Sequence, residues 1–109
     1  MDKTCELLPL ASLEAAAECI KVMAHPIRLR IVDILMQAEL PVHQIAQMCE
    51  LPPHQTCEHL RLLKGHGLLE SVRRGRAVYY RINNPTLPQL LQCIRRTCGA
   101  GSTEEAGEQ

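Results

Sequence analysis

Residues 51–67 read LPPHQTCEHLRLLKGHG and residues 68–82 read LLESVRR-GR-AVYYRI, and these adjoining segments have different hydrophobic periods. From Pro53 to Gly67 the apolar residues recur at helical spacing, and the proline suits a first helical turn. LLESVRR, a turn containing Gly75 and AVYYRI come next, and they follow the alternating period of strands. The stretch therefore predicts a helix followed by a β-hairpin.

Three more helices are expected upstream of this stretch. Ser12 is a suitable cap for the first, and His25-Pro26 should end that helix and begin the second, because proline disfavours helix in the residue before it. Pro41 opens the third, which is short. The expected ranges are about 12–24, 26–38 and 41–50.

The third and fourth helices are joined by residues 50–52, which is the short spacing of a helix-turn-helix. A last helix is expected at 84–98, begun by Asn84-Pro85 and ended by Gly99. This order, with a hairpin before the last helix, predicts a mainly α winged helix-turn-helix fold.

The predicted organisation is one folded domain with two irregular ends. A length of 109 residues is typical of one domain. We expect the winged helix-turn-helix domain at 12–98, between a flexible N-terminal segment at 1–11 and a disordered acidic tail at 99–109, whose hydrophobicity is low.

Charge is distributed unevenly, although the formal net charge is zero. Residues 53–82 contain six basic residues against two acidic ones, whereas 99–109 contain three Glu and no basic residue. Such an asymmetry predicts a basic face and an anionic partner, which the sum of charges conceals.

The physical logic of a basic hairpin beside a helix-turn-helix favours double-stranded DNA. One helix enters the major groove, while the hairpin reaches phosphate or the minor groove nearby. At 100° per residue the fourth helix packs one face on the core and turns the other outward. The candidate DNA-binding residues are His54, Gln55, Cys57, Glu58, Arg61 and Lys64 of the helix, and Arg73, Arg74 and Arg76 of the hairpin. A solvated helix face is the alternative reading.

Tyr79 and Tyr80 are the only aromatic residues in the chain apart from histidine. Strand alternation sends them to opposite faces, so they cannot stack successive bases of a single strand together. We expect Tyr80, which shares its side with Val78 and Ile82, to anchor the hairpin to the core.

Three segments resemble the ArsR/SmtB family of metalloregulatory repressors: KVMAHPIRLRIVDIL at 21–35, ELPVHQIAQ at 39–47 and the whole of 51–82. The resemblance covers about 15–98. Its most specific parts are HPIRLRI, the H-L-R-x-L-x-x-x-G-L-L run that begins at His59, and the hairpin segment at 75–82. It implies a homodimer built through the first and last helices, which binds its operator without effector and is released by an inducer.

The known sensing sites of that family do not carry over. Where its thiolate sensors have cysteines in the third helix, this chain has Pro41, His43 and Ala46. Where its zinc sensors have ligands in the last helix, it has Asn84, Thr86, Thr97 and Ala100. The inducer and any metal ligands therefore cannot be inferred from the family.

Cysteines are the remaining candidates for sensing. A thiolate cluster, within one chain or across the dimer, could bind a soft metal or metalloid ion, and its candidates are Cys5, Cys19, Cys93 and Cys98. Cys57 lies near the N-terminus of the fourth helix, where the helix dipole favours a thiolate, and is a candidate redox switch. The alternative is that these thiols, like Cys49, are small apolar packing residues without a cofactor.

Several function classes find no support in the sequence. It has no Gly-rich phosphate loop, nucleophile elbow or C-x-x-C pair, so an enzyme is not expected. No apolar stretch is long enough for a membrane span, and we expect a cytoplasmic protein. The rival function is a winged-helix module that binds another protein and neither DNA nor inducer, for which so basic a hairpin would be unnecessary.

Overall fold

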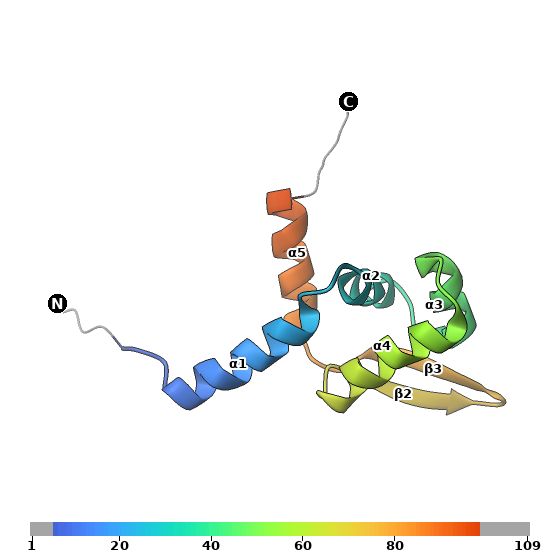
Figure 1. The fold of residues 1–109 in the computed structure, drawn as a ribbon, viewed down its shortest axis with the longest axis horizontal. Helices are drawn as coiled ribbons and strands as arrows, with labels where there is room; N and C mark the ends of the chain where they lie inside the picture. The colour runs from blue at the N-terminus through green and yellow to red at the C-terminus, as the bar shows by residue number, and fades with distance from the viewer. Residues whose placement is uncertain (1–5, 99–109) are drawn as a thin grey trace, which may run out of the picture.

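The computed structural model describes residues 6–98, which contain five helices and a small sheet of three strands (Figure 1). The elements are α1 (Leu10–Met23), α2 (Pro26–Leu35), β1 (Leu40–Pro41), α3 (Val42–Cys49), α4 (Pro53–Gly65), β2 (Leu69–Arg74), β3 (Ala77–Ile82) and α5 (Thr86–Cys98). The predicted order of helices, hairpin and last helix is confirmed, and β1 is an addition. The expected disordered tail at 99–109 lies outside the described residues.

The first helix begins earlier than the sequence predicted. Pro9 occupies the N-cap position with φ −58° and ψ 145°, and its carbonyl accepts hydrogen bonds from the backbone N–H groups of Ser12 and Leu13. No side chain caps the helix. Ser12 is therefore inside α1, and the prediction that it caps the helix is wrong, because the extended backbone of Pro9 already positions the first carbonyl acceptor.

Side-chain caps begin α2 and α5 as the sequence indicated. His25 Nδ1 accepts a hydrogen bond of 3.1 Å from the Ile27 N–H, with Pro26 in the first turn of α2. Asn84 Oδ1 accepts one of 2.9 Å from the Thr86 N–H. The helix α2 ends at Leu35, however, and not near Ala38 as expected.

Strands β1, β3 and β2 form an antiparallel sheet in that order. Tyr80 lies at its centre, opposite Leu40 of β1 and Ser71 of β2. The hairpin of β2 and β3, which we call the wing, closes between Arg74 and Ala77 through Gly75 and Arg76. Gly75 has φ +64° while Arg76 is not among the residues with positive φ, which is the pattern of a tight type II′ turn.

The hydrophobic core lies where α2, α3, α4 and the sheet meet. Its fully buried side chains include Ile31 and Val32 of α2, Ile45 of α3, and Leu60 and Leu63 of α4. Tyr80 is only 8% exposed, which confirms that it anchors the wing to the core. Because residues from every helix and from the wing join this cluster, the wing is held in a defined place relative to α4.

Much of α1 is not covered by the rest of the chain. The helix extends away from the sheet, and α5 rises beside its C-terminal end (Figure 1). Leu10, Leu13 and Ile20 are 71%, 45% and 63% exposed, and the preceding Leu7 and Leu8 are more exposed than half. We call these five residues the apolar α1 surface. Within residues 6–98 no helix has the length and hydrophobicity needed to cross a membrane.

Candidate nucleic-acid interface

The helix α4 has a buried and an exposed face, as its sequence period predicted. Thr56, Leu60 and Leu63 have no exposed surface. The exposed residues of α4 among the predicted DNA contacts are His54, Gln55, Glu58, Arg61 and Lys64, whereas Cys57 is half-buried. The structure therefore presents a row of polar and basic side chains along one side of α4.

The turn before α4 fixes the position of this helix against α3. Glu50 adopts the left-handed conformation with φ 58°, and the Leu51 N–H then donates to the carbonyl of Ala46 at 3.1 Å. The buried hydroxyl of Thr56 donates to the carbonyl of Pro52 at 3.2 Å, so that it needs no other partner. These backbone contacts complete the helix-turn-helix that the sequence predicted.

His59 connects α4 to the preceding helices. The Arg28 Nε donates to His59 Nδ1 at 3.2 Å, and Arg28 Nη1 donates to the carbonyl of Val22 at 3.1 Å. The rings of His59 and His25 lie 4.8 Å apart. Burial lowers the pKa of His59, and the positive charges of His25 and Arg28 lower it further, while Glu58 acts weakly in the other direction. The neutral imidazole is the form that can accept from Arg28.

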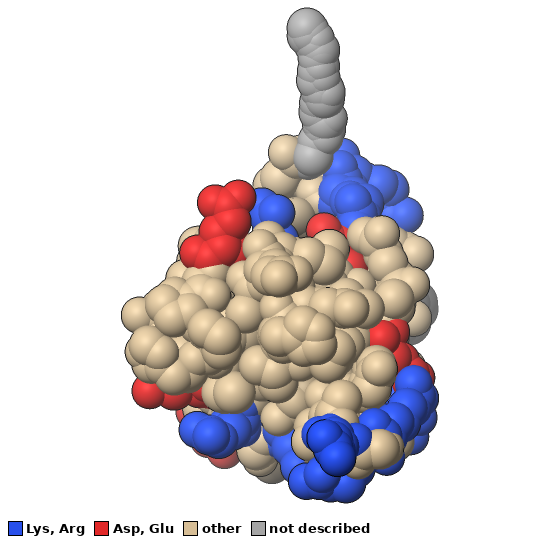
Figure 2. Space-filling view, turned by 90° about the vertical axis from the view of Figure 1, so that its right-hand side faces the viewer, with Lys and Arg blue, Asp and Glu red and all other residues tan. Residues whose placement is uncertain are grey.

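The exposed side of α4 continues onto the wing. Lys64 Nζ donates a hydrogen bond of 2.8 Å to the hydroxyl of Ser71 in β2, and both groups are at the surface. The three predicted contact residues of the wing, Arg73, Arg74 and Arg76, are all exposed. Figure 2 views the end of the molecule where the wing turn lies, and it shows Lys and Arg side chains gathered along the lower edge.

The three arginines of the wing differ in their partners. Arg74 forms an ion pair with Glu39, and its guanidinium lies over the Tyr79 ring at 5.0 Å from the centroid. Within residues 6–98 neither Arg73 nor Arg76 forms an ion pair. The sequence did not reveal the role of Glu39, because that residue is distant from the wing along the chain.

The cysteines are dispersed in the single chain. Cys19 is half-buried in an apolar groove of about 470 Å³ between α1 and the start of α5, and Cys93 and Cys98 are exposed. Cys5 lies outside the described residues. No three His, Cys, Asp or Glu side chains of the described part of one chain gather closely enough to hold a metal ion. The predicted thiolate cluster therefore stays a prediction.

Cys49 has the surroundings of a packing residue. It is half-buried and contacts the core cluster, and burial raises the pKa of its thiol, with a smaller opposite effect from Arg30. A raised pKa keeps the thiol neutral and slow to react. This agrees with the expectation that Cys49 belongs to the core.

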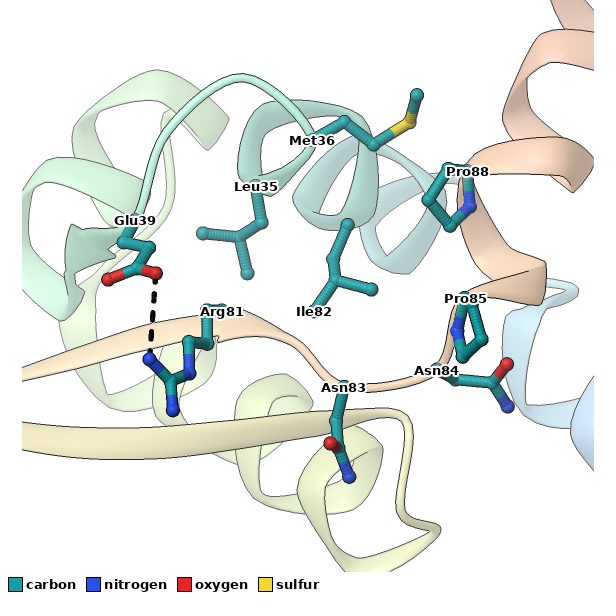
Figure 3. Close-up of a pocket in the computed structure, with 9 residues that line it drawn as sticks. All are labelled: Leu35, Met36, Glu39, Arg81, Ile82, Asn83, Asn84, Pro85 and Pro88. Carbon is teal, nitrogen blue, oxygen red and sulfur yellow. Dashed lines mark ion pairs between the residues drawn. The ribbon is translucent and has the colours of Figure 1, made fainter.

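An open groove of about 430 Å³ lies where the end of β3 meets α2 and α5 (Figure 3). Its walls are largely apolar, with Leu35 and Met36 on one side and Pro85 and Pro88 on the other. The ion pair of Arg81 and Glu39 lies at one end of the groove. The sequence did not predict this groove, since its residues come from separate elements.

Comparisons with known proteins agree with this architecture. Residues 25–71, from the cap of α2 to β2, match the model of the bacterial regulatory protein arsR family. The transcriptional repressor PagR of Bacillus anthracis is 40% identical over 84 residues, which cover 76% of this chain and 84% of PagR. The HTH-type transcriptional repressor SmtB of Mycobacterium tuberculosis is 31% identical over 83 residues, which cover 76% of this chain and 62% of that protein.

Solved structures show the same fold. The crystal structure of PagR matches with a TM-score of 0.71 and 38% identity, over 80% of this chain and all of the other (100%). The homodimeric winged helix-turn-helix DNA-binding domain of Mb0332 from Mycobacterium bovis matches with a TM-score of 0.71 and 33% identity, over 78% of this chain and 79% of that one. The fold is therefore a winged helix-turn-helix, and the chain belongs to the ArsR family of bacterial regulatory proteins, which are regulators and not enzymes.

Proposed function

We propose that the chain is a cytoplasmic, homodimeric transcriptional repressor that binds double-stranded operator DNA and is released from it by an inducer. The observation that carries the proposal is the continuity of the exposed α4 face with the wing, which Lys64 and Ser71 join. A helix and an adjacent basic hairpin can contact the major groove and the neighbouring backbone of one duplex together.

The exposed side chains of α4 and the wing have different proposed tasks. The first turn of α4 offers His54 and Gln55 to base edges, while Glu58 can accept from cytosine. Phosphate contacts are assigned to the basic residues of both elements, and Cys57 lies beside the contact face. The assigned phosphate contacts are Arg61, Lys64, Arg73, Arg74 and Arg76.

Dimerisation is proposed to occur through α1 and α5. The side chains of the apolar α1 surface are largely exposed, which is typical of an interaction site, and a second copy would cover them. The groove that contains Cys19 lies between the same two helices. Two copies related by a twofold axis would present two α4 helices to two half-sites of an operator.

Thiols are the proposed sensor for the inducer, which is a soft metal or metalloid ion or a thiol-oxidising species. Cys19 lies in the groove at the proposed dimer contact, and the exposed Cys93 and Cys98 lie on α5. A ligand or a disulfide at this contact would change how the two protomers meet. Cys57 remains a second candidate, because oxidation there would add bulk beside the DNA.

The test is binding of the purified protein, under reducing conditions and at low salt, to the duplex upstream of its own coding sequence. A scrambled duplex of equal length is the control. Tighter binding to the upstream duplex supports the proposal, and binding to neither duplex would refute it. The bound complex is then challenged with arsenite, zinc, cadmium, copper(I), polysulfide and peroxide, and a complex that survives all of them refutes the thiol sensor while leaving DNA binding intact.

A further inference from the structure

Glu39 joins two arginines of the sheet. The residue lies directly before β1, and one carboxylate oxygen, Oε1, pairs with Arg74 Nη2. The other, Oε2, lies 3.7 Å from Arg81 Nη1, and this second pair is the one drawn in Figure 3. Arg81 Nε also donates to Glu70 Oε2 at 2.7 Å. Positive and negative side chains therefore alternate from Arg74 through Glu39 and Arg81 to Glu70.

The positive charge of one wing arginine, Arg74, is therefore already paired with a carboxylate in the DNA-free protein. Arg73 and Arg76 form no ion pair within residues 6–98, whereas Arg74 shares the charge of Glu39. A DNA phosphate that approaches Arg74 must replace the carboxylate or lie close to it. The two anions therefore compete for the same guanidinium.

We propose that Glu39 is a specificity-determining residue, which competes with phosphate for Arg74 and so weakens sequence-independent binding more than operator binding. The proposal rests on the proposed function, because it needs a protein that binds DNA. It assigns a role in binding to a residue outside both α4 and the wing.

The ion pair between Arg74 and Glu39 is exposed enough for a phosphate to replace the carboxylate. The side chains of Arg74 and Glu39 are 50% and 37% exposed, and ion pairs so close to solvent contribute little to stability. The Tyr79 ring lies under Arg74 and can hold its guanidinium over the sheet whichever anion is bound. Exchange of carboxylate for phosphate therefore needs no rearrangement of the strands.

The difference between specific and non-specific DNA follows from the source of the binding energy. Binding to non-specific DNA comes almost wholly from phosphate contacts, so each arginine whose charge is already paired with a carboxylate weakens that binding directly. In the operator complex, contacts from α4 to base edges fix the position of the protein along the duplex, so the wing stays beside the same phosphate. Phosphate replaces Glu39 at Arg74 most readily in that fixed position.

The experiment compares the full-length wild type with Glu39→Gln on the upstream duplex and on a scrambled duplex over a range of salt concentrations. The affinity of the variant for scrambled DNA should rise roughly threefold to tenfold, and its affinity for the operator should rise less. Its salt slope on scrambled DNA should be steeper by about one. Glu70→Gln is the matched control, because it removes the same charge from Arg81 without touching Arg74. Its gain on scrambled DNA should be smaller.

A second background tests whether Glu39 acts through Arg74. In an Arg74→Gln protein, Glu39→Gln should raise the affinity for scrambled DNA no more than Glu70→Gln does, because the guanidinium for which Glu39 and phosphate compete is gone and only the pair with Arg81 remains. An equal gain in both backgrounds would show a general charge effect and overturn the proposal. Weaker binding of Glu39→Gln to both duplexes would also overturn it, since Glu39 would then position the wing for DNA.

Failure of this proposal differs from failure of the proposed function. A wild type that binds neither duplex refutes the function, and the role of Glu39 falls with it. A wild type that prefers its operator, with a preference that Glu39→Gln leaves unchanged, refutes the role of Glu39 alone. Glu39 is at the surface, so melting temperatures of wild type and variant should agree and will show that both are folded.

Discussion

The two ends of the molecule differ in how completely one chain can bury its apolar residues. In α4 the inward side chains Thr56, Leu60 and Leu63 are fully buried. In α1 only Val22 and Met23, near its C-terminal end, are buried, while Leu10 and Ile20 remain largely exposed. The core of the helix-turn-helix and its wing is therefore filled within one chain, whereas most of the apolar α1 surface is left uncovered within residues 6–98.

This difference separates two kinds of stability. The packing of α4 stabilises the fold of each protomer, whereas the apolar α1 surface should stabilise the association of protomers, with a dependence on protein concentration. Mutations in the two regions should therefore have effects of different size and different concentration dependence.

The largest effect is expected in the α4 core. Leu60→Ala removes a side chain with no exposed surface and should lower the free energy of unfolding by about 2–5 kcal/mol, because it leaves a cavity. Urea unfolding followed by circular dichroism measures it. Met48→Ala, on the 54% exposed Met48 of α3, is the control and should change the free energy by less than about 0.5 kcal/mol. Similar losses for both would contradict the packing described for α4.

A smaller effect, confined to association, is expected in α1. Ile20→Glu would place an unpaired carboxylate in the proposed dimer contact and should weaken the dimer by roughly 2 kcal/mol or more, about thirtyfold in the dissociation constant. Sedimentation equilibrium over a range of protein concentrations measures this. Met48→Glu adds the same charge to an exposed site outside that contact and should leave the dimer unchanged. An unaffected Ile20→Glu dimer would move the interface away from α1.

A third effect concerns the wing and should leave stability unchanged. Arg76→Gln removes an exposed charge at the turn, and should weaken DNA binding about threefold to tenfold on every sequence and reduce the salt slope by about one. Fluorescence anisotropy at several salt concentrations measures both. Arg96→Gln removes a charge that is also exposed, at the far end of α5, and is the matched control. Equal salt slopes for the two variants would show that the wing does not contact the phosphate backbone.

The smallest effect should come from pH. The fold lowers the pKa of His59 below its ordinary value of 6.5, through burial and the charges of His25 and Arg28. The neutral ring is therefore favoured in the folded state, so its contribution is complete above pH 6.5 and is lost as the pH falls below 6.5 through the folded pKa. His59→Asn keeps an acceptor for Arg28 but cannot titrate. Its melting temperature should fall less than that of the wild type between pH 7.5 and pH 5, and parallel curves would refute this role of His59.

Local periodicity in the sequence was enough to predict the helices, the wing and the inward position of Tyr80. Each of these depends on residues a few positions apart, such as the alternation around Tyr80 or the cap that His25 provides for α2. The strand β1 was missed because Leu40–Pro41 is too short to show an alternation. The start of α1 was misplaced because Pro9, a residue without a capping side chain, took the position assigned to Ser12.

The features that the sequence could not predict join residues that are distant along the chain. Glu39 meets Arg74 only because β1 pairs with β3 and brings the segment before β1 beside the wing. Arg28 meets His59 only because α2 packs on α4. The predicted thiolate cluster likewise joins cysteines from separate elements, and it stays a prediction.

The tight turn at Gly75 and Arg76 limits how the wing can change during evolution. Inserting or deleting one residue in β3 between the turn and Tyr80 would shift the register by one and turn Tyr80 out of the core, while Tyr79 would turn in. Two residues added to each strand preserve both faces and keep a hydrogen-bonded pair at the turn, because such pairs alternate along an antiparallel ladder. Wings of this kind should therefore differ in length by multiples of about four residues among relatives that keep a two-residue turn, and each such step would carry the basic tip about 7 Å farther from the core.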